Sequence, residues 1–233
     1  MKRKSRNSSE MRSIRVTPDF AGSSFGSVLF EMGETKIICA ASVSTDVPDH
    51  AKNKGNGWLT AEYSLLPYST SPRTKRELLK RDGRSVEIQR LIGRSLRCAV
   101  DLAMMQNYSI AIDCDVLKAD GGTRTAAITG GYIALEQAVS RMIKEGMIEQ
   151  SPIIENVAAI SVGMVEGEML LDLDFYEDSR ADVDMNIVMN GSFDIIEIQG
   201  TGEKKTFSIG QMNEMVALAG NGILKLVEIQ NSI

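Results

Sequence analysis

A junction between a predicted strand and a predicted helix carries the first residues that could do chemistry. The segment Asp120-Gly121-Gly122-Thr123-Arg124-Thr125 places two glycines where the strand ends and the helix begins. Glycine lets a backbone approach a ligand closely, and the amide groups at a helix N-terminus attract anions. Arg124 adds a planar, two-pronged donor that suits phosphate oxygens. The segment therefore indicates phosphate binding, and an ordinary helix start capped by Thr123 or Thr125 is the alternative.

A second group of candidate residues is acidic and lies in a predicted connection between strands. Its members are Asp172, Asp174, Glu177, Asp178, Asp182 and Asp184. Closely spaced carboxylates repel one another unless a cation or a basic partner neutralises them. Oxygen ligands of this kind suit Mg²⁺, held jointly by protein and substrate phosphates, or Mn²⁺. Asp182 and Asp184 would share one face if a strand has already begun there, and a solvated acidic turn is the alternative.

The single histidine narrows the possible chemistry. His50 lies in a polar segment, so the chain offers little to a two-histidine nuclease or to a Ser-His-Asp hydrolase. If the protein cleaves phosphodiesters, metal, arginine and carboxylate groups must carry the reaction. Phosphate would be a convenient nucleophile, because it is charged near neutral pH and needs less help from a base than water does.

The charge of the chain is unevenly distributed. The 233 residues carry a net charge of −5, but residues 1–16 carry +5 and residues 73–97 carry +6, which leaves −16 on the remainder. Net acidity would ordinarily argue against a polyanionic partner. The two basic stretches are nevertheless candidates for contact with RNA, phosphate or a neighbouring subunit.

Alternating strands and helices must position these residues. Two strands over 26–32 and 35–42 flank the turn Gly33-Glu34 and form a predicted hairpin. The other expected elements are strands over 58–66 and 108–117, helices over 123–144 and 207–227, and four strands between 156 and 198 that break at Glu166-Gly167 and Asn190-Gly191. This order predicts an α+β fold in which mixed sheets pack against helices. We expect one domain over 1–233 with a basic N-terminal arm over about 1–16.

One further helix is predicted from Val86 to about Met105, because its apolar residues recur at intervals of three and four. Arg90, Arg94 and Arg97 fall together on its polar face. This row of arginines is either a binding surface or an ordinary solvated face.

The cysteines and the hydropathy pattern bear on the compartment. Cys39, Cys98 and Cys114 each have apolar neighbours and form no C-x-x-C motif, so we expect buried thiols in a reducing compartment. No apolar run approaches the roughly 18 residues of a membrane span, and a signal-peptide pattern is absent. The expectation is a cytoplasmic protein with no membrane partner.

Several segments, in order along the chain, resemble the ribonuclease PH family of bacteria. They are residues 57–63, 83–97, 113–130, 177–189 and 197–201. The resemblance extends from about Arg12 to the last helix. It implies a phosphorolytic 3′-to-5′ exoribonuclease, also called tRNA nucleotidyltransferase, which trims the 3′ ends of tRNA precursors. Inorganic phosphate attacks the last phosphodiester and releases a nucleoside diphosphate, and the reverse reaction adds nucleotides. The family fold is a compact β-α-β-α arrangement that assembles into a homohexameric ring, a trimer of dimers.

The resemblance also implies roles for individual residues. The attacking phosphate would be held by Arg84, Gly122, Thr123 and Arg124. Asp178 and Asp184 would hold Mg²⁺ or Mn²⁺, with one of them assisting proton transfer, so the catalytic set is Asp178, Asp184 and Arg124. RNA would be approached by Arg73, Arg76 and Arg90.

Two positions depart from the family pattern, and two other functions compete with phosphorolysis. Tyr68 stands where relatives usually have arginine, which bears on one RNA or subunit contact, and Ser13 stands where proline commonly follows Arg12. A catalytically inactive RNA-binding ring subunit is the main alternative, although Arg124, Asp178 and Asp184 are all retained. A hydrolytic metal nuclease would have no use for an arginine cradle around phosphate.

Overall fold

The computed structural model describes residues 3, 6–76 and 82–233. Lys2, Lys4, Lys80 and Arg81, which contribute to the predicted basic stretches, lie outside the described residues. The strands are β1 (Ile14–Pro18), β2 (Gly26–Met32), β3 (Thr35–Ser44), β4 (Trp58–Leu65), β5 (Ser109–Lys118), β6 (Val157–Val165), β7 (Glu168–Leu171), β8 (Val183–Asn190) and β9 (Ile195–Thr201). The helices are α1 (Asp49–Lys52), α2 (Gly83–Arg97), α3 (Thr123–Lys144), α4 (Phe175–Asp178) and α5 (Ile209–Gln230), with a 3₁₀ turn over Leu102–Met105.

The first sheet has five strands in the order β1-β2-β3-β5-β4. The predicted hairpin forms its centre, with Phe30 opposite Ile37, and Gly33 supplies the positive φ that its tight turn requires. β4 lies parallel to β5, whereas the other pairs in this sheet are antiparallel. The sheet thereby brings the end of β5, where the glycine pair lies, close to the chain that leaves β4.

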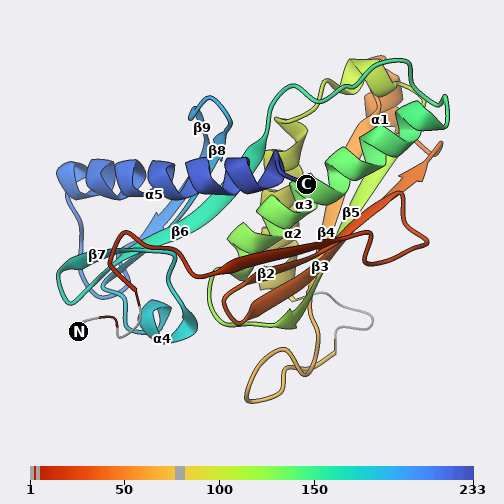
Figure 1. Ribbon diagram of the computed structural model, residues 1–233. Coiled ribbons are helices and arrows are strands. Elements are labelled where there is room, and N and C mark those ends of the chain that lie inside the picture. The colour runs from red at the N-terminus through yellow and green to blue at the C-terminus, as the bar shows by residue number, and fades with distance from the viewer. Residues whose placement is uncertain (1–2, 4–5, 77–81) are drawn as a thin grey trace.

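The second sheet has the order β7-β6-β8-β9 and is antiparallel throughout. Every residue of β6 is buried, as its nearly continuous apolar sequence requires. α3 and α5 both pack against β6, and α3 also packs against β2 and β3 of the first sheet. α5 lies along the second sheet, and α3 joins the two sheets (Figure 1).

One hydrophobic core extends through both sheets and the three long helices. Its largest buried members include Phe30, Ile112 and Tyr132, and the same cluster continues to Ile160 and Ile223. The predicted α+β fold with sheets packed against helices is confirmed. No helix in the described part of the chain has the length and apolar character that crossing a membrane requires.

The helix predicted from Val86 to about Met105 is shorter than expected. α2 ends at Arg97, and a separate 3₁₀ turn follows at residues 102–105. The side chain of Asp101 accepts a hydrogen bond from the amide of Ala103, so it caps the new turn instead of continuing the helix. The apolar spacing in the sequence continues beyond the end of α2 because Leu102 and Met105, in the 3₁₀ turn, also pack toward the core.

The cysteine prediction is wrong at one position. Cys39 and Cys114 are buried and lie opposite each other in β3 and β5, but Cys98 is exposed just beyond α2. The N-terminal arm also holds a strand, β1, which the sequence reading did not predict.

Candidate active site

One cavity of about 550 Å³ brings the two groups of candidate residues together. The predicted phosphate-binding and metal-binding residues that line it are Arg84, Gly122, Thr123, Arg124, Asp178 and Asp184. They come from the N-terminal ends of α2 and α3, the end of α4 and the start of β8. Residues separated widely in sequence therefore converge at one place in the fold.

The junction between β5 and α3 forms one wall of the cavity. Gly122, the residue before α3, has a φ of 64°, and no side chain among the described residues caps the helix there. Thr125 donates its hydroxyl hydrogen bond to the carbonyl of Gly122, and Thr123 accepts one from Tyr63 at 2.8 Å. The helix start capped by Thr123 or Thr125 is therefore wrong, because Gly122 occupies the N-cap position and both threonines lie within the helix. The positive end of the 22-residue helix α3 faces the cavity, which suits an anion.

Gly121 explains why two glycines stand in this turn. Its φ is 76°, and a Cβ there would lie 2.5 Å from the carbonyl oxygen of Leu173 and 2.8 Å from the amide nitrogen of Phe175. Only glycine lets the turn approach the chain that enters α4 so closely. The glycine turn before α3 and the segment that leads into α4 are thus in close backbone contact.

Arg124 reaches the cavity with partners that the sequence reading missed. Its guanidinium donates to Gln199 Oε1 at 3.0 Å and to Glu87 Oε1 at 3.3 Å. Gln199 lies in β9, within the segment 197–201 that resembles the ribonuclease PH family. Arg84 is exposed and lines the same cavity from the start of α2. Two guanidinium groups therefore flank the helix N-terminus.

The opposite wall carries the paired carboxylates. Burial, followed by the nearby charge of Asp178, raises the pKa of Asp184 to about 6. Burial also raises the pKa of Asp178, while the positive charges of Arg84 and Arg124 oppose that rise. Asn186 donates a hydrogen bond to Asp184 at 3.4 Å. Two carboxylates that disfavour each other's charge form a site that a cation would stabilise.

Glu203 is a third carboxylate at the cavity that the sequence reading missed. It lines the cavity and raises the pKa values of both Asp178 and Asp184 through its charge. It is exposed and lies just after β9, where neither spacing nor hydropathy distinguishes it from an ordinary surface glutamate. Only the fold places it opposite the aspartate pair.

Other members of the acidic run do not reach the cavity. Asp182 is buried and pairs with Lys205 at 2.9 Å. β8 begins at Val183, after Asp182, so the condition under which Asp182 and Asp184 would share one strand face is not met. Asp172 and Glu177 are held by arginines of the N-terminal arm. The repulsion within the run is relieved mainly by basic side chains.

The cavity fits a metal ion that uses few protein ligands. The described ranges contain no group of three or more metal-ligating side chains. Mg²⁺ usually keeps several waters and binds through one or two carboxylates together with substrate phosphates. Asp178 and Asp184 supply such a pair, beside a wall suited to phosphate.

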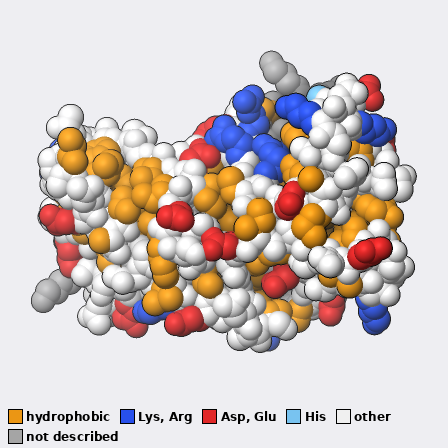
Figure 2. Space-filling model, turned by 90° about the horizontal axis from the view of Figure 1, so that it is seen from above, with side chains coloured by type: hydrophobic (Ala, Val, Ile, Leu, Met, Phe, Trp, Pro, Cys, Tyr) orange, Lys and Arg blue, Asp and Glu red, His pale blue; other side chains and the backbone are white. Residues whose placement is uncertain are grey.

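The three predicted RNA-binding arginines lie outside the cavity. Arg73 and Arg76 are exposed on the connection between β4 and α2. Arg90 lines a separate groove of about 330 Å³ with Arg94, Arg97 and Trp58. Lys and Arg side chains gather in one part of the face shown in Figure 2.

The arginines of α2 do not act alike. Arg97 stacks over the ring of Trp58 at 4.9 Å and donates to the carbonyl of Leu59, so part of its role is packing. Arg94 pairs with Glu197 at 2.7 Å. Two of the three arginines on the polar face of α2 therefore bind partners within the chain.

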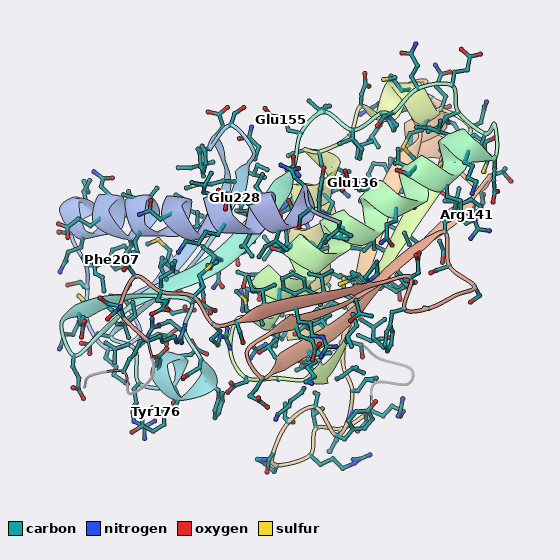
Figure 3. All side chains as sticks on the ribbon, viewed as in Figure 1. Glu136, Arg141, Glu155, Tyr176, Phe207 and Glu228 are labelled. Atoms are coloured by element: carbon teal, nitrogen blue, oxygen red, sulfur yellow. The ribbon has the colours of Figure 1, made fainter. Side chains whose placement is uncertain are left out.

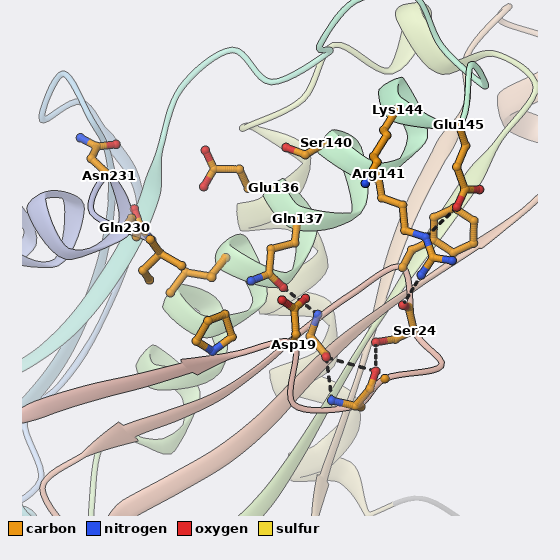
Figure 4. Close-up of a pocket in the computed structure, with 17 residues that line it drawn as sticks. Asp19, Ser24, Glu136, Gln137, Ser140, Arg141, Lys144, Glu145, Gln230 and Asn231 are labelled. Carbon is orange, nitrogen blue, oxygen red and sulfur yellow. Dashed lines mark hydrogen bonds and ion pairs between the residues drawn. The ribbon is translucent and has the colours of Figure 1, made fainter.

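Two other surface features are separate from this cavity. A larger cavity of about 1090 Å³ lies between α3, the end of α5 and the segment before β2, where Glu136 and Arg141 line it, and no predicted site residue takes part (Figure 4). Tyr176 lies on the outer side of α4, and Arg180 stacks on its ring (Figure 3). Neither feature brings the two candidate groups together.

Comparison with known proteins shows the family to which the chain belongs. Two family models match, described as the 3′ exoribonuclease family, domain 1, over residues 10–140, and domain 2 over residues 155–222. Ribonuclease PH of Crocosphaera subtropica is 52% identical over 226 residues, which covers 97% of this chain and 94% of that protein. Ribonuclease PH of Syntrophomonas wolfei is 51% identical over 230 residues, covering 98% and 96% respectively.

Solved structures share the fold at low sequence identity. A chain of the Archaeoglobus fulgidus exosome with RNA bound to the active site matches with a TM-score of 0.80 and 20% identity, covering 96% of this chain and 90% of that one. Rice Rrp46 matches with a TM-score of 0.78 and 18% identity, covering 97% and 95%. At these identities the likeness supports the fold alone.

Proposed function

The chain belongs to the 3′ exoribonuclease family, in which its close relatives are ribonucleases PH, and from this premise we propose how its cavity performs phosphorolysis. The protein is a phosphorolytic 3′-to-5′ exoribonuclease that processes tRNA precursors. One observation carries the assignment of the site: a single cavity joins an anion-binding helix start and two arginines to a pair of carboxylates. Each group has a part in attack by phosphate on a phosphodiester.

Inorganic phosphate is the co-substrate, and we place it at the start of α3. The amides near Gly122 and Thr123, with Arg84 and Arg124, would hold it and partly neutralise its charge. A phosphate oxygen attacks the phosphorus of the last phosphodiester, and the bond to the 3′ oxygen of the preceding nucleotide breaks. The products are a nucleoside diphosphate and an RNA shorter by one nucleotide, and the released 3′ oxygen takes a proton.

The carboxylate pair would hold Mg²⁺ or Mn²⁺ and serve proton transfer. When bound, the metal would stabilise negative charge on phosphate oxygens. Asp178 and Asp184 would supply the oxygen ligands that such an ion prefers, and their mutual repulsion would fall once a cation is bound. We assign to one of this pair the delivery of the proton to the 3′ oxygen.

The RNA, the assembly and the domain organisation follow as part of the same proposal. Arg73, Arg76 and Arg90 would contact the RNA backbone, since all three are exposed arginines outside the cavity.

The active form would be a homohexamer, a trimer of dimers, whose mass native mass spectrometry can measure. Residues 1–233 would work as one unit, because Arg124 comes from the first matched region and Asp178 from the second.

The identity of the released nucleotide tests the reaction. The protein is incubated with a tRNA that bears extra 3′ nucleotides and Mg²⁺, with and without phosphate. Nucleoside diphosphates that form only with phosphate support phosphorolysis. Monophosphates would indicate hydrolysis, and no product would indicate a binding subunit, so either result contradicts the proposal.

A matched pair of arginine variants tests the proposed role of Arg124 in phosphate binding. Arg124→Ala should abolish phosphate-dependent trimming and leave RNA binding largely intact, because its guanidinium lies at the cavity. Arg15→Ala removes an arginine whose side chain is 79% exposed, and it should retain activity. Normal trimming by Arg124→Ala at ordinary phosphate concentration would refute the assigned role.

A further inference from the structure

The N-terminal arm packs its arginines against the segments that form the active-site cavity. The side chains of Arg3, Arg6 and Arg12 are only 5%, 9% and 7% exposed. Their principal partners are Asp172 and Glu177, which lie on the acidic run just before the proposed metal ligand Asp178. The sequence favoured RNA, phosphate or another subunit as the target of this positive charge. For these three arginines the target is the acidic segment of the same chain.

Arg12 contacts the chain segments that lead into the two walls of the cavity, on both sides. Its backbone amide and its Nε donate to Asp172 Oδ2 at 2.7 and 2.9 Å. Its terminal nitrogens donate to the carbonyl oxygens of Asp120 and Gly121, in the turn that leads into α3. One guanidinium therefore joins the anion-binding turn to the segment that leads into α4.

The surrounding backbone is shaped around the Arg12 side chain. A Cβ at Gly33 would lie 2.6 Å from Arg12 Cδ, and a Cβ at Gly122 would lie 3.1 Å from its Nη2. The buried hydroxyl of Thr35 supports the same turn by donating to the carbonyl of Gly121 and accepting from the amide of Asp120. The Arg12 side chain is therefore closely surrounded by backbone, and its guanidinium lies next to Gly122, the residue before α3.

The acidic partners are tied in turn to the proposed metal site. Asp172 is fully buried and has a φ of 55°, in the left-handed region that residues other than glycine adopt uncommonly. Arg6 pairs with both Asp172 at 3.2 Å and Glu177 at 2.9 Å. Glu177 also accepts from the amide of Asp174 in the capping box of α4, and Asp178 is the next residue. A shift of this network would therefore move Asp178.

We propose that Arg12 is a positioning residue that holds the phosphate-binding turn in register with the carboxylate pair. The inference rests on the proposed function, in which phosphate binds at the turn and the carboxylates act across the cavity. A planar guanidinium is suited to this task because it can bond a carboxylate and two carbonyls at once, in fixed directions. A lysine would keep the charge opposite Asp172 but has no planar fork to bond the turn as well. Displacements of about 1 Å in such a site can lower rates roughly a hundredfold.

The test compares Arg12→Lys with the control Arg15→Lys, which alters an exposed arginine of the same arm. For Arg12→Lys we expect the KM for phosphate to rise about tenfold or more, while the affinity for RNA changes less than about twofold. Calorimetric titration with inorganic phosphate alone should show the same loss of affinity. Arg15→Lys should match the wild type in both measurements.

A second variant keeps the test decisive if lysine weakens folding. Arg12→Gly leaves space for a guanidinium, and added methylguanidinium should restore part of kcat/KM and of phosphate affinity. The inference is overturned if Arg12→Lys binds phosphate as the wild type does. It is also overturned if neither variant folds, or if methylguanidinium restores nothing, because Arg12 would then serve stability alone.

The calorimetric measurement separates this inference from the proposed function. If the wild type released no diphosphates, the proposed function would fail, yet phosphate binding could still depend on Arg12. If diphosphates formed and phosphate affinity were unchanged in Arg12→Lys, the function would stand and the inference would fail.

Discussion

Replacement of Asp184 by asparagine should stabilise the metal-free protein, and the gain should grow with pH. Burial and the neighbouring charge of Asp178 raise the pKa of Asp184 from its ordinary 3.8 to about 6. The folded protein therefore binds this proton more tightly than the unfolded chain does. Stability is lost as the pH rises from about 4 to about 6, and the full cost is present above that range.

The difference between the two pKa values sets the size of the effect. It corresponds to a cost of about 3 kcal/mol at pH 8 and about 1 kcal/mol near pH 4.5, as upper estimates. Asparagine has nearly the same shape, carries no charge and can still accept the hydrogen bond from Asn186. Asp184→Asn should recover most of the cost at pH 8 and little of it at the lower pH.

Urea unfolding in the presence of a chelator provides the assay. The wild type, Asp184→Asn and the exposed-site control Asp194→Asn are compared at both pH values. The control should change stability by less than about 0.5 kcal/mol. Added Mg²⁺ should then stabilise the wild type and leave Asp184→Asn unchanged. If Asp184→Asn were no more stable than the wild type at pH 8 without metal, the reasoning from burial and repulsion would be refuted.

Three further predictions concern the turn, the RNA surface and the exposed thiol. Gly121→Ala should lower the melting temperature and abolish trimming, since its Cβ would lie 2.5 Å from the carbonyl oxygen of Leu173; a normal melting curve with normal activity would contradict this. Arg90→Gln should reduce the slope of log affinity for RNA against log salt by about one if Arg90 contacts a phosphate, and an unchanged slope would assign Arg90 another role. Cys98 should react with a thiol reagent in the native protein while the two buried cysteines react only after unfolding; labelling of all three at one rate would show otherwise.

Local patterns in the sequence predicted most of the elements. The helix at residues 123–144 matches α3, because the glycine pair ends the strand and apolar spacing continues to Lys144. The turn at Gly33-Glu34 also lies where the residues indicated. These features depend on neighbours along the chain, so the sequence alone was sufficient to predict them. The helix α2 was predicted too long because a separate 3₁₀ turn, capped by Asp101, follows it, and apolar periodicity does not register that break.

The residues that meet at the candidate site could be singled out from the sequence, but their contacts with one another could not. Glycine, arginine and aspartate segments indicated phosphate and metal chemistry, and the fold brings them to one cavity. The partners of Arg12 could not be found, because Asp172 is 160 positions away and many acidic residues are available. Glu203 gave no local signal for the same reason. The excess of basic residues near the N-terminus is visible in the sequence. The burial of Arg3, Arg6 and Arg12 is not, because it depends on distant acidic partners.

The long separation between Arg12 and Asp172 has a consequence during synthesis. At typical elongation rates of about 5–20 residues per second, Asp172 follows Arg12 from the ribosome by roughly ten to thirty seconds. For that interval the arginines of the arm have no acidic segment to bind, and the two walls of the cavity cannot be joined. A nascent or prematurely released chain that lacks Asp172 would therefore hold no assembled centre with which to degrade RNA, including the message from which it is being translated.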